Sequence, residues 1–198
     1  MRLPLLIGLA SLALTTVSRA ADADEYAPHH DGDEWIMDAV IVSPQGAITN
    51  ATIHRKRSGT EERNGKTYAR TRTWLEGGPF AFDETKLTRK DATGFYSLDP
   101  KDPNAAEKVE LLLPLKVGQT WPKRIGQLNA TDTVIGRETV TLNGETYQNC
   151  FHIRTASPDG KYTEDYWEAP KVGGIKSVID YGNGASITLA VREFKPGK

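Results

Sequence analysis

Residues 131–155, TDTVIGRETVTLNGETYQNCFHIRT, contain the pattern that decides the fold of this chain. Two runs rich in Thr, Val, Ile and Tyr flank the dipeptide Asn143-Gly144. Asn-Gly tolerates the positive φ angles that a two-residue hairpin turn requires. Side chains alternate along the second run, with Phe151 and Ile153 on one face and polar side chains on the other. The stretch therefore predicts two antiparallel strands joined by a tight turn.

Turn signals of the same kind recur along the chain, at Asn64-Gly65, Asp159-Gly160 and Gly182-Asn183-Gly184. Between them, apolar and polar side chains alternate, which places one face of a strand on a core and the other toward water or a cavity. The segments that we predict as strands are Trp35–Ser43, Ala47–Arg57, Lys66–Glu76, Phe82–Lys90, Gly94–Leu98, Val109–Leu113, Thr131–Leu142, Glu145–Thr155, Lys161–Glu168, Gly174–Tyr181 and Ala185–Phe194. A short helix around Asn104–Glu110 competes with the extended segment that begins at Val109.

Three sequence landmarks occur twice, in the same order, at offsets of 86, 79 and 80 residues. They are Pro28-x-x-x-Gly32-x-x-Trp35 with Pro114-x-x-x-Gly118-x-x-Trp121, Asn64-Gly65-Lys66-Thr67-Tyr68 with Asn143-Gly144-Glu145-Thr146-Tyr147, and Gly94-Phe95-Tyr96-Ser97-Leu98 with Gly174-Ile175-Lys176-Ser177-Val178. Duplication of a β unit explains them, and chance recurrence of common turn sequences is the alternative.

We predict an all-β, mainly antiparallel protein of two related halves, 28–113 and 114–198, that form one globular unit. A curved sheet, an open barrel and a sandwich all fit the pattern. Trp35 and Trp121 would anchor the first strand of each half. The inner face of such a sheet is expected to be apolar.

The first residues predict export. Arg2, the apolar run Leu3–Leu14 and the small residues Ser18 and Ala20 form a secretory signal peptide over 1–20, followed by a flexible acidic leader over 21–27. The apolar run is too short for a permanent transmembrane helix. We therefore expect an exported protein, periplasmic or extracellular, with no transmembrane segment after signal removal.

Charge and motif content exclude several functions. The formal net charge is −1 with both signs interspersed, which gives no sign of nucleic-acid binding. Cys150 is the only cysteine, so no internal disulfide forms. The chain lacks the motifs of serine hydrolases and phosphate-binding loops, and no cofactor is predicted. Arg55, Lys56 and Arg57 make the first hairpin basic. We expect a solvated face there, with an acidic partner or lipid headgroups as the alternative.

Two stretches resemble known sequence elements. Residues 113–121 read LPLKVGQTW, and residues 162–176 read YTEDYWEAPKVGGIK. They are similar to the "P-L-K-V-G-x-x-W" opening and the "Y-W-x-A-P-x-V-G-x-I-K" closing element of exported bacterial β-proteins of unknown function. The resemblance covers mainly the second half, and those proteins usually carry glycine where this chain has Lys171. It implies export and a β-sheet fold, and it implies no activity.

Two clusters carry side chains suited to chemistry. His29, His30 and Asp31 are metal-ligand types, but neighbours on an extended chain point in opposite directions, so we expect a polar turn rather than a metal site. Glu164 and Glu168 flank Trp167 and share a strand face, which suits a hydrolase that uses two carboxylates. We expect a solvated strand face instead, because catalytic carboxylates usually come from different strands across a cleft.

The function that we predict is non-catalytic. An exported cell-envelope protein would bind a partner or an apolar ligand in the concavity of its curved sheet, where burial of apolar ligand surface contributes about 25 cal/mol per Å². The candidate ligand-binding residues are the aromatic side chains Trp35, Trp121, Tyr166 and Trp167. A hydrolase that uses Glu164 or Glu168 is one alternative, and a structural module of an envelope assembly is the other.

Overall fold

The computed structural model describes residues 26–198. The predicted signal peptide at 1–20 and residues 21–25 of the predicted leader lie outside the described residues. The last two leader residues are not flexible, because Tyr26 and Ala27 are 2% and 7% exposed and pack in the core. The leader predicted over 21–27 is wrong at this end. No helix in residues 26–198 is long and apolar enough to cross a membrane.

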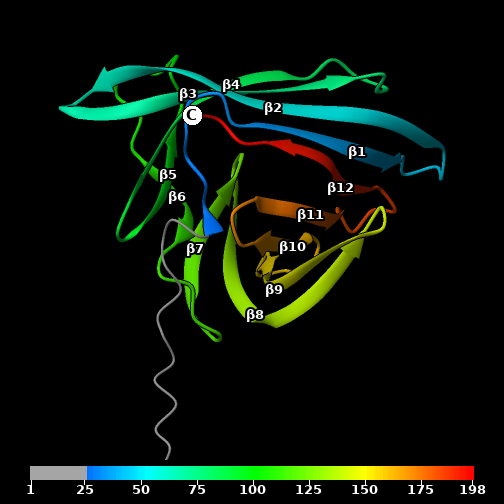
Figure 1. The fold of residues 1–198 in the computed structure, drawn as a ribbon. Coiled ribbons are helices and arrows are strands. Elements are labelled where there is room, and N and C mark those ends of the chain that lie inside the picture. Colours follow the sequence, from blue (N-terminus) through cyan, green and yellow to red (C-terminus); the bar gives the residue numbers. More distant parts are fainter. Residues whose placement is uncertain (1–25) are drawn as a thin grey trace, which may run out of the picture.

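The described chain folds into one antiparallel sheet of twelve strands (Figure 1). The strands are β1 (Glu34–Val42), β2 (Ile48–Arg63), β3 (Lys66–Glu76), β4 (Asp83–Asp91), β5 (Gly94–Leu98), β6 (Lys108–Leu112), β7 (Thr120–Ile125), β8 (Leu128–Leu142), β9 (Glu145–Ala156), β10 (Thr163–Ala169), β11 (Gly173–Asp180) and β12 (Ser186–Lys195). Their order across the sheet is β6-β5-β4-β3-β2-β1-β12-β11-β10-β9-β8-β7. The prediction of an all-β, mainly antiparallel protein is confirmed.

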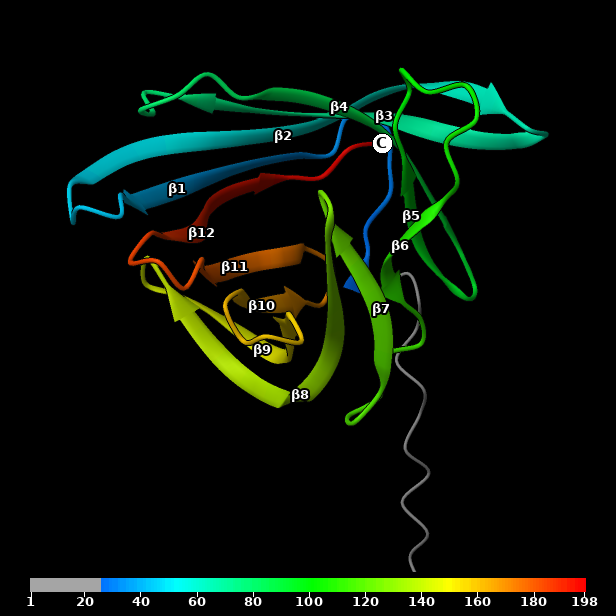
Figure 2. The same ribbon diagram turned by 180° about the vertical axis from the view of Figure 1, so that it is seen from behind.

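The sheet consists of two six-stranded meanders joined where β1 pairs with β12. Strong curvature brings the outer strands β6 and β7 back toward each other, as Figures 1 and 2 show. No backbone ladder joins these two edges in the described chain. Side chains bridge them instead, since Lys123 Nζ in β7 lies 2.8 Å from Glu110 Oε2 in β6. The result is a nearly closed barrel with one seam.

Strand β7 is absent from the sequence prediction, although the other eleven strands lie where expected. Pro122 interrupts the strand pattern there, and a proline cannot donate a ladder hydrogen bond. The structure accommodates Pro122 because β7 is an edge strand that pairs only with β8. Of the two alternatives weighed for this stretch, the helix around Asn104–Glu110 is absent and the extended segment is present, because residues 105–107 are irregular and Lys108–Leu112 is a strand.

The predicted two-residue turns have the expected backbone. Asn64 and Gly65 have φ angles of 50° and 71°, and Asn143 and Gly144 have φ angles of 51° and 84°. Both turns lie in the left-handed region that hairpins of this type require. Lys171, in the β10–β11 connection, also lies there with a φ angle of 66°. Lysine disfavours this conformation, and glycine adopts it without steric cost.

Three hydrogen bonds fix the turn before β1, and two of them join it to β2. Gly32 N donates to Arg57 O at 3.1 Å, and Arg57 N donates to Asp33 O at 2.9 Å. His30 N donates to Asp33 Oδ2 at 2.7 Å. Together they fix the entry into the first strand of the first half.

The same three hydrogen bonds recur before β7 in the second half. Gly118 N donates to Val134 O and Val134 N donates to Gln119 O, both at 2.9 Å. Lys116 N donates to Gln119 Oε1 at 3.0 Å. Trp121 follows in β7 as Trp35 follows in β1. Corresponding backbone positions thus have corresponding partners, while duplication of the unit stays a prediction.

A buried ion pair lies beside the first of these turns. Arg57 Nη1 lies 3.0 Å from Asp33 Oδ2, and the residues are 5% and 0% exposed. Asp33 Oδ1 accepts a further hydrogen bond from Gly197 N at 2.8 Å. The Arg57 guanidinium also lies over the Trp35 ring, 4.8 Å from its centroid. The pair therefore joins the segment before β1, strand β2 and the segment after β12.

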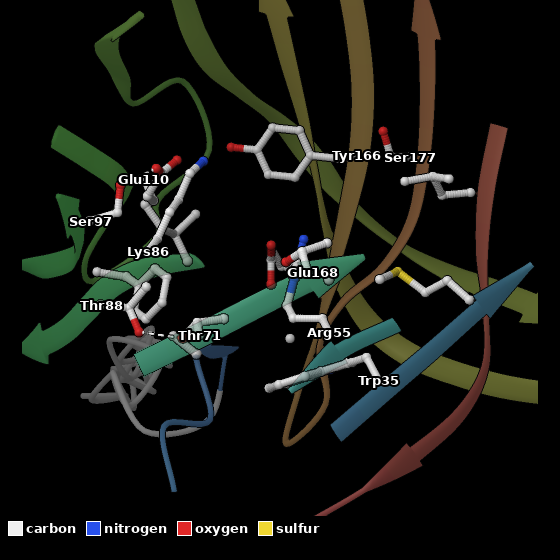
Figure 3. Close-up of a pocket in the computed structure, with 18 of the residues that line it drawn as sticks. Trp35, Arg55, Thr71, Lys86, Thr88, Ser97, Glu110, Tyr166, Glu168 and Ser177 are labelled. Carbon is white, nitrogen blue, oxygen red and sulfur yellow. Dashed lines mark hydrogen bonds between the residues drawn. The ribbon is translucent and has the colours of Figure 1, made fainter. Parts of the chain in front are cut away.

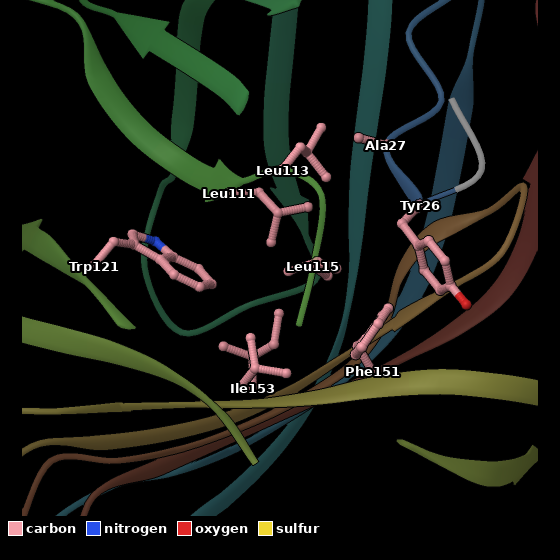
Figure 4. Packing of buried hydrophobic residues seen from close by; sticks show 9 residues of the cluster. Tyr26, Ala27, Leu111, Leu113, Leu115, Trp121, Phe151 and Ile153 are labelled. Atoms are coloured by element: carbon pink, nitrogen blue, oxygen red, sulfur yellow. The ribbon is translucent and has the colours of Figure 1, made fainter. Parts of the chain in front are cut away.

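The largest apolar cluster fills the end of the barrel near the seam (Figure 4). It combines side chains from the N-terminal segment, β6, the link between β6 and β7, and the strands β7 to β9. Its buried members are Tyr26, Ala27, Leu111, Leu113, Leu115, Trp121, Val134, Phe151 and Ile153. The rings of Tyr26 and Phe151 meet edge to face at 4.8 Å between centroids. Apolar packing thus closes this end, where no backbone ladder does.

Replacing the buried arginine should destabilise the fold strongly. We expect Arg57→Met to lower the free energy of unfolding by about 3–5 kcal/mol, because Asp33 keeps its buried charge without a counter-ion. Arg192→Met removes an exposed pair with Asp38 and should cost less than about 1 kcal/mol. Urea denaturation measures both values, and equal losses would contradict a special role for Arg57.

Replacing Lys171 by glycine should stabilise the protein. We expect Lys171→Gly to raise the free energy of unfolding by about 0.5–1 kcal/mol, since glycine relieves the left-handed backbone at this position. Lys161→Gly, at an exposed position outside that region, should not stabilise. Thermal unfolding followed by circular dichroism compares the two variants, and a lower melting temperature for Lys171→Gly would contradict the explanation.

Candidate functional site

A cavity of about 430 Å³ lies inside the curved sheet (Figure 3). Ten of the twelve strands contribute side chains to its wall, so residues far apart in sequence meet there. One part of the wall is apolar and aromatic, formed by Trp35, Met37, Ile53, Phe82, Phe95, Leu111 and Leu189. The other part is charged, formed mainly by Arg55, Arg57, Glu84, Lys86, Glu110, Lys123, Glu164 and Glu168. The sequence led us to expect an apolar inner face. That expectation is wrong, because part of the inner face is charged.

A polar network crosses the seam at one side of the cavity. Lys123 Nζ lies 2.8 Å from Glu110 Oε2 and 3.9 Å from Asp132 Oδ2. Asp132 accepts hydrogen bonds from Thr155 Oγ1 and, at 3.2 Å, from Tyr166 OH. Burial is the largest single influence and raises the pKa of Glu110, but Lys123, Lys86 and Ser97 together outweigh it and lower this pKa to about 2. Each charge in the network thus has a partner in the protein.

Two serines at matching positions of the halves hold carboxylates in the cavity wall. Ser97 Oγ in β5 donates to Glu110 Oε1 at 2.5 Å. Ser177 Oγ in β11 donates to Glu164 Oε1 at 2.7 Å. Tyr162 OH also donates to Glu164, at 3.1 Å to Oε2. Both carboxylates thus already accept hydrogen bonds from hydroxyl groups of the protein.

Arg55 and Glu168 differ from the other charged groups of the wall. Neither side chain forms a hydrogen bond or ion pair with any residue of 26–198. Both reach into the same part of the cavity from different strands, β2 and β10, as Figure 3 shows. The Glu168 carboxyl oxygens pack near the backbone of Gly173 and Gly174, where even a single methyl group would contact them. Two ionisable side chains, one basic and one acidic, therefore face the cavity without a hydrogen-bond or ion-pair partner in residues 26–198.

Burial strongly perturbs the Glu168 carboxyl. It raises the pKa from its ordinary value of 4.5 to about 8, although Arg55, Lys123 and Arg57 act in the opposite direction. Enclosure in protein disfavours the ionised carboxylate more than these cations favour it. Glu168 is therefore mainly neutral at pH 7 and can donate a hydrogen bond into the cavity.

Only two of the four aromatic residues that we predicted to bind a ligand line the cavity. Trp35 and Tyr166 line the cavity, and Trp35 Nε1 donates to Val172 O at 2.7 Å. Trp121 packs in the apolar cluster instead, and its Nε1 has no hydrogen-bond partner in the described chain. Trp167 lies on the opposite face of β10 from Glu168, where its ring stacks on His152 at 4.7 Å between centroids.

The metal-ligand candidates point to different partners. His29 Nε2 lies 3.0 Å from Thr88 O, and its ring contacts Phe95. Asp31 Oδ1 accepts a hydrogen bond from Gly59 N at 2.7 Å, while the side chain of His30 is 62% exposed. Burial lowers the pKa of His29 to about 4. Among residues 26–198, no three His, Cys, Asp or Glu side chains converge on one metal position.

Sequence reasoning missed the basic side of the cavity. The run Arg55-Lys56-Arg57 predicted a solvated face, but alternation along β2 separates its members. Arg55 and Arg57 line the cavity, and Lys56 is exposed and pairs with Glu34. The alternation of side chains along the strand could have revealed this, because Arg55 and Arg57 are two and four residues after the apolar Ile53 and therefore lie on the same face.

No protein-family model matches the chain, and no curated protein matches its sequence. A Parabacteroides distasonis protein, provisionally described as a lipoprotein, superposes with a TM-score of 0.48 and 12% identity, covering 86% of this chain and 98% of that one. A Bacteroides fragilis protein, provisionally described as exported with a YmcC-like fold, gives 0.49 and 13% over 86% and 99%.

A Vibrio parahaemolyticus domain, provisionally described as an outer membrane lipoprotein-sorting protein domain, gives a TM-score of 0.25 and 8% identity over 86% of this chain and 87% of that one. At these identities and scores, the likeness carries no conclusion about function.

Neutralising Glu168 should stabilise the protein at high pH only. Folding raises the pKa of Glu168 from 4.5 to about 8. The folded protein therefore loses stability as the pH rises from 4.5 to about 8, because the unfolded chain releases this proton first. We expect Glu168→Gln to melt roughly 5 °C above wild type at pH 9 and to match wild type at pH 5. Glu193→Gln, at an exposed carboxylate, should show no such difference. A pH-independent effect of Glu168→Gln would show that its carboxyl is not perturbed by burial.

Proposed function

We propose that this chain is a non-catalytic, exported cell-envelope protein that binds a small molecule with an apolar portion inside its curved sheet. One observation carries the proposal, a cavity of about 430 Å³ bounded by ten strands of one sheet. Small-molecule sites are typically concave, of this size, and lined by apolar walls with a few polar groups.

The apolar wall supplies the binding energy in this proposal. Trp35, Met37 and Leu189 come from the adjacent strands β1 and β12, where the two halves join. An aliphatic or aromatic group against this wall would lose its contact with water, which contributes about 25 cal/mol for each Å² buried. The charged groups opposite would orient the ligand rather than supply most of the affinity.

Export rests on the sequence. The signal peptide predicted at 1–20 and the resemblance of residues 113–121 and 162–176 to elements of exported bacterial β-proteins both support an envelope location. The proposal predicts a mature chain that begins at Ala21, which N-terminal sequencing of the protein purified from cell fractions would identify.

A hydrolase is the second candidate, and one observation favours it. Glu164 and Glu168 both face the cavity rather than bulk solvent, and a carboxyl with a pKa of about 8 suits a general acid. However, two hydroxyl donors already occupy Glu164. Binding also accounts for the unpaired Arg55, which a two-carboxylate mechanism does not use. We therefore favour binding.

A larger side chain in the cavity should weaken binding of an apolar ligand without unfolding the sheet. Leu189→Trp places a larger side chain in the apolar wall, and we expect it to weaken binding of 1-decanol at least tenfold in calorimetric titration. Val40→Trp, at an outward position that is 39% exposed, is the matched control and should bind as wild type does. If both variants bind 1-decanol as tightly as wild type does, this cavity is not the binding site.

A further inference from the structure

We infer that Arg55 and Glu168 form the headgroup site of this cavity and that the ligand is a single-chain amphiphile with a carboxylate at its polar end. The inference rests on the proposed function and adds the chemical class of the ligand. The two residues extend from different strands, β2 and β10, into one region of the cavity, and neither has a hydrogen-bond or ion-pair partner in residues 26–198.

Pairing within the protein singles out Arg55 among the cations of the wall. Arg57 pairs with Asp33 at 3.0 Å, Lys123 with Glu110 at 2.8 Å, and Lys86 with Glu84 at 3.4 Å. The Lys176 ammonium lies over the Trp167 ring on the outer face. Arg55 alone has no hydrogen bond, ion pair or ring contact in the described chain. A partly buried guanidinium with five unused donors fits a planar, two-oxygen acceptor.

Glu168 complements the arginine in its neutral form. Its surroundings hold Arg55 and Arg57 from β2, Lys123 from β7 and Glu164 from its own strand, so cations outnumber anions around it. The neutral carboxyl can donate its O–H to a ligand oxygen while Arg55 donates its N–H groups. Burial keeps Glu168 protonated at pH 7, so it does not repel an incoming carboxylate.

An amine headgroup fits these residues less well. An ammonium ion would lie near the unpaired Arg55 and would need Glu168 to ionise inside the protein. A carboxylate instead gives Arg55 the counter-ion that it lacks, and the apolar chain extends along Trp35, Met37 and Leu189. Charge, hydrogen bonding and apolar burial are then satisfied together.

Three probes with the same alkyl chain test the inference: decanoate, 1-decanol and decylamine. Calorimetric titration of the folded protein at pH 7 should show decanoate binding about tenfold to a hundredfold more tightly than 1-decanol, since hydrogen bonds to charged groups contribute differences of this order. Arg55→Gln should remove this advantage and leave 1-decanol binding unchanged. Arg124→Gln, at an exposed arginine of β7, should retain it. Circular dichroism confirms that each variant is folded.

The pH profile tests Glu168 separately. Decanoate stays ionised above pH 6, so wild-type affinity should fall as pH rises through about 8, where Glu168 loses its proton. In Glu168→Gln, which keeps a neutral donor, the affinity should no longer fall. Equal binding of decanoate and 1-decanol, or preference for decylamine, would overturn the headgroup assignment and leave the cavity as a binding site. If none of the three probes binds, the proposed function fails as well.

Discussion

The buried ion pair between Arg57 and Asp33 holds together the parts of the chain that close the sheet. Asp33 accepts hydrogen bonds from His30 N and Gly197 N, so the segments before β1 and after β12 meet at its carboxylate. A charge without water is tolerated only when it is paired and hydrogen-bonded. The segments that flank β1 and β12 are therefore restricted in position, which supports the pairing of these two strands at the join between the two meanders. A few residues before the pair, Tyr26 packs in the core.

The opposite side of the sheet is closed by different means. Backbone ladders run from β6 through ten intervening strands to β7, but none closes the seam in the described chain. The salt bridge between Lys123 and Glu110 and the apolar cluster around Trp121 connect these edges. Polar groups placed inside a seam must be satisfied, which explains the network that continues to Asp132. Arg55 and Glu168 differ from this network, because neither has a hydrogen-bond or ion-pair partner in residues 26–198.

Matching positions of the two six-stranded meanders carry different side chains. Arg57 and Val134 make the same backbone hydrogen bonds after the same turn, yet one forms a buried ion pair and the other packs in the apolar cluster. The interior is therefore asymmetric, with an apolar end near Val134 and a charged region near Arg57.

Eleven of the strands and the tight turns follow from local signals, because Asn143-Gly144 and the alternation around it need no distant partner. The sequence also contained the clue to β7, since Trp121 repeats Trp35, although Pro122 hid the strand. Only the tertiary structure decided which face of β2 became the interior, and so turned Arg55 from a surface residue into a cavity residue. Alternation shows that two faces differ, but curvature and the pairing of β1 with β12 decide which face is enclosed.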